Sequence, residues 1–189
     1  MPSSLAQKLS PADLKTYVAL LEQAQFYPHR VFEEVKTFQE KHPDLPEAAN
    51  LLIYLYIQKK ELVKAEKLTQ ENYEKFPDYL FARINYADQC LRKKQWDQIP
   101  KIFPSFHLRE LYPEKKLFHF SEFRGFMVTM GLYYLALKNR AAAKEYLDHA
   151  RLADPDHSSV KLLEKKLRAN FIMRFWDDLR KNLPQRSQR

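Results

Sequence analysis

The chain has 189 residues, of which 45% are apolar and 30% are charged, so it can bury a core and is not a disordered protein. Its two glycines exclude collagen-like sequence and almost every phosphate-binding loop that depends on repeated glycines. The single cysteine cannot form an internal disulfide, and the net charge of +8 makes nucleic acid, anionic lipid and acidic protein surfaces partners to consider.

Neither a leader nor a membrane segment is evident in the sequence. Residues 1–9 lack the unbroken apolar core of a signal peptide. The most apolar run, residues 126–137, is too short to span a bilayer and is predicted to be a buried helix. We therefore expect a cytoplasmic protein.

Two helix starts are predicted near the beginning of the chain. Ser10 precedes a proline, and Asp44 precedes Pro46 and Glu47. An oxygen-bearing side chain before the helix, a proline in its first turn and a nearby acid all stabilise a helix N-terminus. We expect helices to begin after Ser10 and after Asp44, with these two residues as the N-caps.

Prolines followed by aspartate recur at a spacing that indicates an internal repeat. Pro43 and Pro77 lie 34 residues apart, and Pro155 follows after a further 78, which is two periods of 34 plus ten residues. Between these prolines the apolar residues recur at helical spacing in two groups per period. Each period is therefore predicted to be a helix, a turn, a second helix and a proline that ends it.

This pattern resembles the tetratricopeptide repeat (TPR) family, and the best match covers residues 124–157. The residues there at the small, aromatic and proline positions of the motif are Gly131, Tyr134, Ala143, Ala150 and Pro155. The resemblance implies that Gly131 lets the two helices of this pair approach closely and that Tyr134 fills the wedge between them. In residues 46–79 Asn72 replaces the usual alanine, which predicts a looser crossing of that pair.

The resemblance implies an all-α superhelix, a TPR-like solenoid of antiparallel helix pairs that forms a single domain over residues 1–183. Stacked repeats leave an apolar end that a terminal helix covers. The predicted parts are repeats at about 12–43, 46–79, 80–113 and 124–157, an insertion at about 101–123, a capping helix at about 158–183 and a disordered tail at 184–189.

The insertion accounts for the ten extra residues. Pro100, Pro104 and Pro113 lie in or beside it, so the second helix of the third repeat is predicted to be short or irregular. The insertion is also rich in phenylalanine, tyrosine and leucine. We expect it to pack back on the repeats, and the alternative is that it lies over the binding groove.

No pattern of catalytic, cofactor-binding or metal-ligating residues stands out. The six histidines show no zinc-ligand spacing, and Cys90 falls inside a predicted helix, where a small buried side chain is expected. Both glycines fall in one helix, so no glycine-rich phosphate loop exists. We expect no enzyme activity, no cofactor and no metal ion.

The working surface is expected to be a concave groove, because the family stacks the first helices of successive repeats side by side. From the first repeat the resemblance places Thr16, Leu20 and Gln23 there. From the later repeats it places Asn50, Tyr54, Ile57, Phe81, Ile84, Asn85, Asp88, Arg92, Val128, Leu132 and Leu135.

This predicted groove is apolar and aromatic with a few amides, which suits a peptide with hydrophobic anchors. Tyr54 and Phe81 are the expected anchors, Asn50 and Asn85 would bond to the peptide backbone, and Arg92 would pair with an acid. The positions at which some family members clamp a C-terminal carboxylate lack the required basic residues, so that function is not expected.

These features predict a non-catalytic protein–protein interaction scaffold, chaperone-like, that binds a hydrophobic peptide segment of a partner protein. The alternative is an RNA- or membrane-surface adaptor that acts through the basic and aromatic C-terminal helix. The residues of that secondary patch are Lys165, Arg168, Phe171, Arg174, Phe175 and Trp176. A homodimer through the same apolar surface is a third alternative, and in a fourth the insertion or the C-terminal helix fills the groove.

Overall fold

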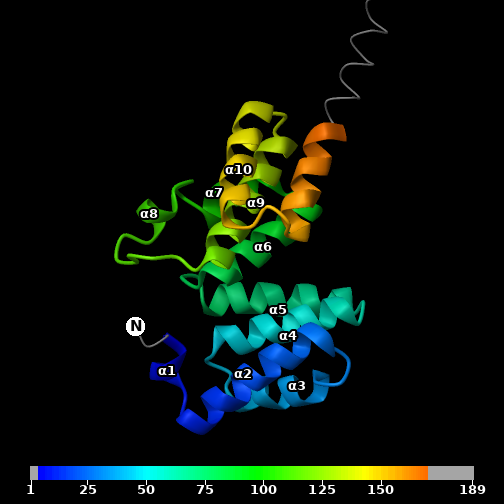
Figure 1. Cartoon of the computed structure of the whole chain (residues 1–189), viewed down its shortest axis with the longest axis vertical. Coiled ribbons are helices and arrows are strands. Elements are labelled where there is room, and N and C mark those ends of the chain that lie inside the picture. The colour runs from blue at the N-terminus through cyan, green and yellow to red at the C-terminus, as the bar shows by residue number, and fades with distance from the viewer. Residues whose placement is uncertain (1–3, 170–189) are drawn as a thin grey trace, which may run out of the picture. The chain divides into compact units, whose positions relative to one another are not determined.

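The structure is a computed structural model of the chain, and residues 4–169 are described here (Figure 1). These residues form helices joined by turns, with no strand among them, as the sequence predicted. The chain divides into two compact units, Met1–Gln89 and Cys90–Arg189, and the single domain expected over residues 1–183 stays a prediction. Within residues 4–169, no helix combines the length and the apolar character that crossing a membrane requires.

The first unit is a row of helices, each packed against its neighbours in the sequence (Figure 1). They are α1 (Ser4–Lys8), α2 (Pro11–Phe26), α3 (Phe32–Lys41), α4 (Pro46–Gln58), α5 (Leu62–Lys75) and the beginning of α6 (Leu80–Arg92). Their shared core includes Ala24, Val35 and Leu55, each at most 1% exposed. The rings of Tyr73 and Tyr86 stack with centroids 4.6 Å apart and so join α5 to α6.

The two predicted N-caps differ in outcome. Ser10 caps α2 as predicted, because its hydroxyl oxygen accepts a hydrogen bond from the backbone N–H of Asp13 at 3.1 Å. The N-cap of α4 is Leu45, without a side-chain cap, so the prediction of an Asp44 cap is wrong. Asp44 instead forms an exposed ion pair with Lys75, 2.8 Å from its Nζ.

Side chains of neighbouring helices bond to the first turn of α4. The Tyr17 hydroxyl donates to the Glu47 carbonyl at 3.2 Å, and Asn72 Nδ2 donates to the Pro46 carbonyl at 3.4 Å. Tyr17 and Asn72 are both buried. Asn72 occupies a position at which the repeat motif usually has alanine. Its side chain therefore bonds α5 to the start of α4.

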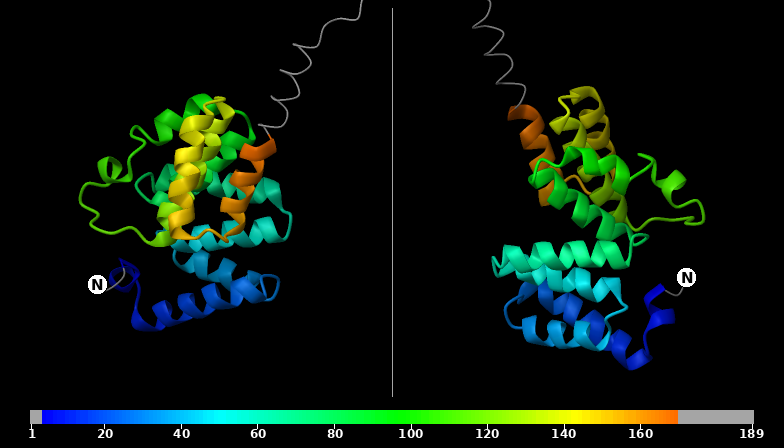
Figure 2. Two further views of the ribbon diagram at one scale, coloured as in Figure 1. Left: turned by 45° about the horizontal axis from the view of Figure 1, so that its top comes forward. Right: turned by 180° about the vertical axis from the view of Figure 1, so that it is seen from behind.

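The second unit contains one long helical hairpin and several short elements (Figure 2). The elements that follow α6 are η1 (Trp96–Gln98), α7 (Ile99–Ile102), α8 (Leu108–Leu111), α9 (Phe120–Ala136), α10 (Arg140–Ala153) and an unlabelled helix at 158–169. The helical stretch before Phe103 is short and irregular, as the prolines predicted. Ala143 and Ala150 are fully buried in a core that α9, α10 and helix 158–169 share.

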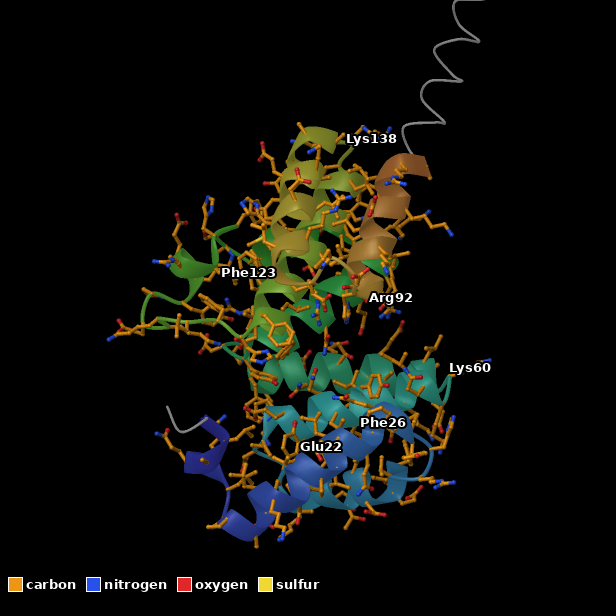
Figure 3. All side chains as sticks on the ribbon, viewed as in Figure 1. Glu22, Phe26, Lys60, Arg92, Phe123 and Lys138 are labelled. Carbon is orange, nitrogen blue, oxygen red and sulfur yellow. The ribbon has the colours of Figure 1, made fainter. Side chains whose placement is uncertain are left out.

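The same turn recurs in three places between consecutive helices. Lys60, Lys94 and Lys138 adopt left-handed backbone conformations, with φ of 61°, 59° and 62°. Each donates its N–H to the carbonyl three residues earlier, and the next residue donates to the carbonyl five residues earlier. This is the Schellman ending of a helix, at a position where glycine is usual. Figure 3 labels Lys60 and Lys138 at these turns.

A second local arrangement recurs at five helix ends that precede a proline in residues 4–169. In each case the last N–H bonds to the carbonyl four residues earlier, and its own carbonyl accepts from the N–H three residues later. Proline at the next position has no N–H and cannot continue the helix. The residues that precede the prolines are Tyr27, His42, Phe76, Tyr112 and Asp154. The spacing of 34 between His42 and Phe76 is the period that the sequence predicted.

Gly131 permits a close approach, but to a different helix from the predicted one. A Cβ atom at Gly131 would lie 2.5 Å from Leu163 Cδ2, and its three nearest heavy atoms all belong to Leu163. The close approach is therefore between α9 and helix 158–169, whereas the sequence pattern predicted it within the α9–α10 pair. Tyr134 does lie between α9 and α10, because its ring stacks on that of Tyr146 with centroids 5.5 Å apart.

The Gly131–Leu163 contact predicts strong coupling between two substitutions. Leu163→Ala alone should lower the free energy of unfolding by about 2–5 kcal/mol, because Leu163 is fully buried. In the Gly131→Ala background the same change should cost about 1 kcal/mol less, since the added methyl group fills part of the vacated space. Urea unfolding of the four proteins measures this coupling. If the destabilisations of the two single variants sum to that of the double variant within about 0.5 kcal/mol, the contact is contradicted.

Asp13 predicts a loss of stability in acid. Hydrogen bonds from Lys41 Nζ at 2.6 Å and from Ser10 Oγ at 2.7 Å lower the pKa of Asp13 to about 2 from 3.8. A lowered pKa in the folded state stabilises the fold above the unfolded value, and this contribution disappears as the pH falls towards the folded value. The gap in thermal midpoint between wild type and Asp13→Asn should therefore be constant above about pH 5 and shrink below it. A gap that persists to about pH 2 would exclude this assignment.

Candidate functional site

The segment between α7 and α9 packs on the α9–α10 hairpin through aromatic rings, as expected for the insertion. Phe103 is fully buried, and its ring meets that of Phe126 edge-on with centroids 5.2 Å apart. The Phe106 ring makes a similar contact with Tyr134 at 5.8 Å. These two phenylalanines attach the start of the segment to the hairpin.

A hydrogen bond reinforces this attachment. The Tyr146 hydroxyl on α10 donates to the backbone carbonyl of Phe106 at 3.1 Å. Burial, with smaller contributions from Tyr134 and Glu145, raises the pKa of Tyr146 to about 12. The hydroxyl therefore keeps its proton and remains a donor at neutral pH.

An open pocket of about 720 Å³ lies between this segment and the hairpin. Leu117, Phe120 and Leu152 on its walls are 82%, 55% and 81% exposed, which is unusual for side chains of this size. Phe123, labelled in Figure 3 near the start of α9, also lines it. The polar lining residues are His107, Arg109, Lys116, Glu145 and His149. The pocket is thus largely apolar with a few charged groups on its walls.

A smaller hollow of about 260 Å³ lies in the first unit, on α2 and α4. It contains two of the predicted groove residues, Asn50 and Tyr54, and Tyr54 is 38% exposed. From α2 it is lined by Leu21 and Gln25, whereas the predicted Leu20 is buried in the core. A shift of one or two positions along α2 separates the observed lining from the predicted one.

Several other predicted groove residues are not available to a ligand. Ile84, Val128 and Leu135 are at most 8% exposed, and Leu132 packs against the same core as Val128. Val128 and Leu135 are buried because α9 is apolar on nearly all sides and neighbouring helices cover it, and Leu132 on the same helix is half-buried. Ile84 is buried on α6. The three buried residues are corrections to the predicted groove.

The remaining predicted groove residues lie on α4 and α6. Asn85 Nδ2 donates to Asn50 Oδ1, so these two amides bond to each other. Ile57 is 45% exposed, and its place in a groove stays a prediction. The other three keep at least part of their side chains exposed, and they are Phe81, Asp88 and Arg92.

Only part of the predicted basic and aromatic patch is described. Lys165 and Arg168 are exposed on helix 158–169, and Arg168 pairs with Glu164. The other predicted patch residues lie outside the described residues and stay predictions, as do the end of the capping helix and the tail at 184–189. The patch residues outside the described range are Phe171, Arg174, Phe175 and Trp176.

Metal-binding and nucleophilic groups do not gather at either hollow in the described part of the chain. Across residues 4–169 no three histidine, cysteine, aspartate or glutamate side chains lie close enough together to hold a metal ion. Cys90 is 1% exposed, a buried side chain as the sequence predicted. The features that characterise the two hollows are their shape, their apolar surface and their charged groups.

Comparisons of the chain with protein-family models, with curated proteins and with solved structures found no significant match.

The Tyr146–Phe106 hydrogen bond predicts how firmly the segment is held. Tyr146→Phe removes a bond worth about 1 kcal/mol, so trypsin should cleave after the exposed Lys116 about fivefold faster. Tyr133→Phe is the matched control, because the Tyr133 ring also contacts Phe106 but its hydroxyl bonds to no described residue. Equal cleavage rates for the two variants would show that the hydrogen bond does not hold the segment.

Proposed function

We propose that the chain is a non-catalytic protein-interaction module that binds a hydrophobic segment of a partner protein. The pocket of about 720 Å³ in the second unit receives the main apolar side chain of that segment. One observation carries the proposal: Leu117, Phe120 and Leu152 leave large apolar side chains uncovered around a single hollow. Exposed apolar groups gathered at a concave site are typical of interaction surfaces.

We also propose that the helix pairs form the TPR-like solenoid that the sequence resembles. The recurrence of one turn at Lys60, Lys94 and Lys138, with spacings of 34 and 44 residues, supports this arrangement. The spacing of 44 is one period plus the ten residues of the insertion. Repeated hairpins with equivalent ends are the units from which such arrays are built.

The size and lining of the pocket suit a peptide side chain. Burial of one leucine or phenylalanine from water contributes about 1.5–3 kcal/mol, so two such anchors contribute about 3–6 kcal/mol before ordering costs, and the rest of the segment must supply further contacts for micromolar affinity. The hollow on α2 and α4 offers a second contact, where Tyr54 is 38% exposed. Its volume of about 260 Å³ suits a single side chain.

Selection of peptides from a random dodecamer library tests this proposal. Wild-type protein should enrich peptides with adjacent aromatic or aliphatic residues. Leu117→Ser/Phe120→Ser should weaken their binding at least about tenfold by fluorescence anisotropy, because two apolar contacts are lost.

Val63→Ser is the matched control, because Val63 is 84% exposed on α5 and lines neither hollow. It should leave the affinity unchanged. Tyr54→Ala reports separately on the hollow of the first unit. If the library yields no binding peptide, or if the selected peptides bind the pocket variant as tightly as wild type, the pocket is not the binding site.

A further inference from the structure

We propose that the bound segment is acidic, with a carboxylate beside its apolar anchor that pairs with Arg109 and Lys116. This inference rests on the proposed function, because it concerns the ligand of the same pocket. It follows from the charged groups on the pocket walls, which have no ion-pair partner among the described residues.

Arg109 and Lys116 are exposed on the segment that closes the pocket, and both line it. Neither forms an ion pair with any residue in the described part of the chain. Nearby cations behave differently, since Lys115 Nζ lies 2.6 Å from a Glu122 carboxylate oxygen and Arg124 lies 3.0 Å from Asp154. These two cations on the pocket walls therefore have no ion-pair partner among the described residues.

A carboxylate on the ligand is the group that suits these two side chains. The arginine guanidinium bonds a carboxylate through two parallel N–H groups, and lysine adds a point charge. Because both lie beside uncovered apolar surface, an acidic residue next to an aromatic or aliphatic one can use both features at once. Each exposed pair contributes little, so the carboxylate gives preference and orientation more than affinity.

Glu145 sets the direction of the ligand. It lines the pocket from α10, and no described residue forms an ion pair with it. A carboxylate beside Glu145 is repelled, whereas one beside Arg109 and Lys116 is attracted. The acidic residue of the ligand therefore lies towards α8, and an uncharged or basic residue lies towards α10.

Nucleic acid fits these charges less well. The charged lining residues are Arg109, Lys116 and Glu145, a net charge of only +1 with neutral histidines. Strong binding to a polyanion uses several phosphate contacts at once. A peptide with one or two carboxylates matches the pocket better.

The random dodecamer library tests this inference through its sequence statistics. Peptides selected on wild-type protein should carry an excess of aspartate and glutamate next to their apolar anchors. Selection on Arg109→Gln/Lys116→Gln should lose this excess and keep the apolar anchors. For the best acidic peptide, replacement of its acids by the corresponding amides should weaken binding to wild type about three- to tenfold and leave binding to the double variant unchanged.

Two further variants sharpen the test. Glu145→Gln should tighten binding of the acidic peptide about two- to threefold, because a repulsion is removed. Lys101→Gln/Lys161→Gln removes two exposed charges of the same unit outside the pocket and should keep the acidic preference.

The failures are distinguishable from one another. If wild-type protein selects no peptide at all, the proposed function itself is wrong. Apolar peptides without an acidic excess, or an acidic excess that survives in Arg109→Gln/Lys116→Gln, would leave the function standing and overturn this inference. Tight binding of a twenty-residue uridine RNA that this double variant abolishes would also overturn it.

Discussion

The fold depends on apolar helix faces that only a neighbouring helix can cover. The longer helices have between 10 and 17 residues, which is marginal for an isolated helix in water. Each is therefore stable only because its apolar side packs on the next element of the chain. Within residues 4–169, the three Schellman turns and the five helix ends that share the proline arrangement fix where one helix stops and the next begins, so successive apolar faces meet.

The same requirement explains how the pocket of the second unit arises. Phe103 and Phe106 cover part of α9 and α10 and attach the start of the insertion. The later part of the segment has no comparable contact at Leu117, which stays 82% exposed. One end of the segment is thus fixed while apolar side chains further along remain uncovered, and a hollow forms between segment and hairpin.

The charged groups on the pocket walls distinguish one end of this apolar surface from the other. Lys115 and Arg124, near the pocket, already have acidic partners within the chain, so the overall charge of +8 says little about the site by itself. Arg109 and Lys116 are exceptions among the described residues. A pocket with apolar walls and a local excess of positive charge selects by the neighbours of an anchor residue as well as by the anchor itself.

The sequence alone determined the helical fold class, the helix ends before Pro43, Pro77 and Pro155, and the spacing of 34 residues, because these depend on neighbours along the chain. Proline at Pro43, Pro77 and Pro155 removes an N–H wherever it stands, and Ser10 bonds to a backbone group only three residues away. Only the tertiary structure decided three further points: that Asp44 pairs with Lys75 and does not cap α4, that helix 158–169 approaches Gly131 closely, and which predicted groove residues are buried. Ile84 and Val128 have the spacing of groove residues, but burial depends on which faces other helices cover. The pocket could not be predicted for the same reason, since its walls come from segments that approach only when the chain has folded.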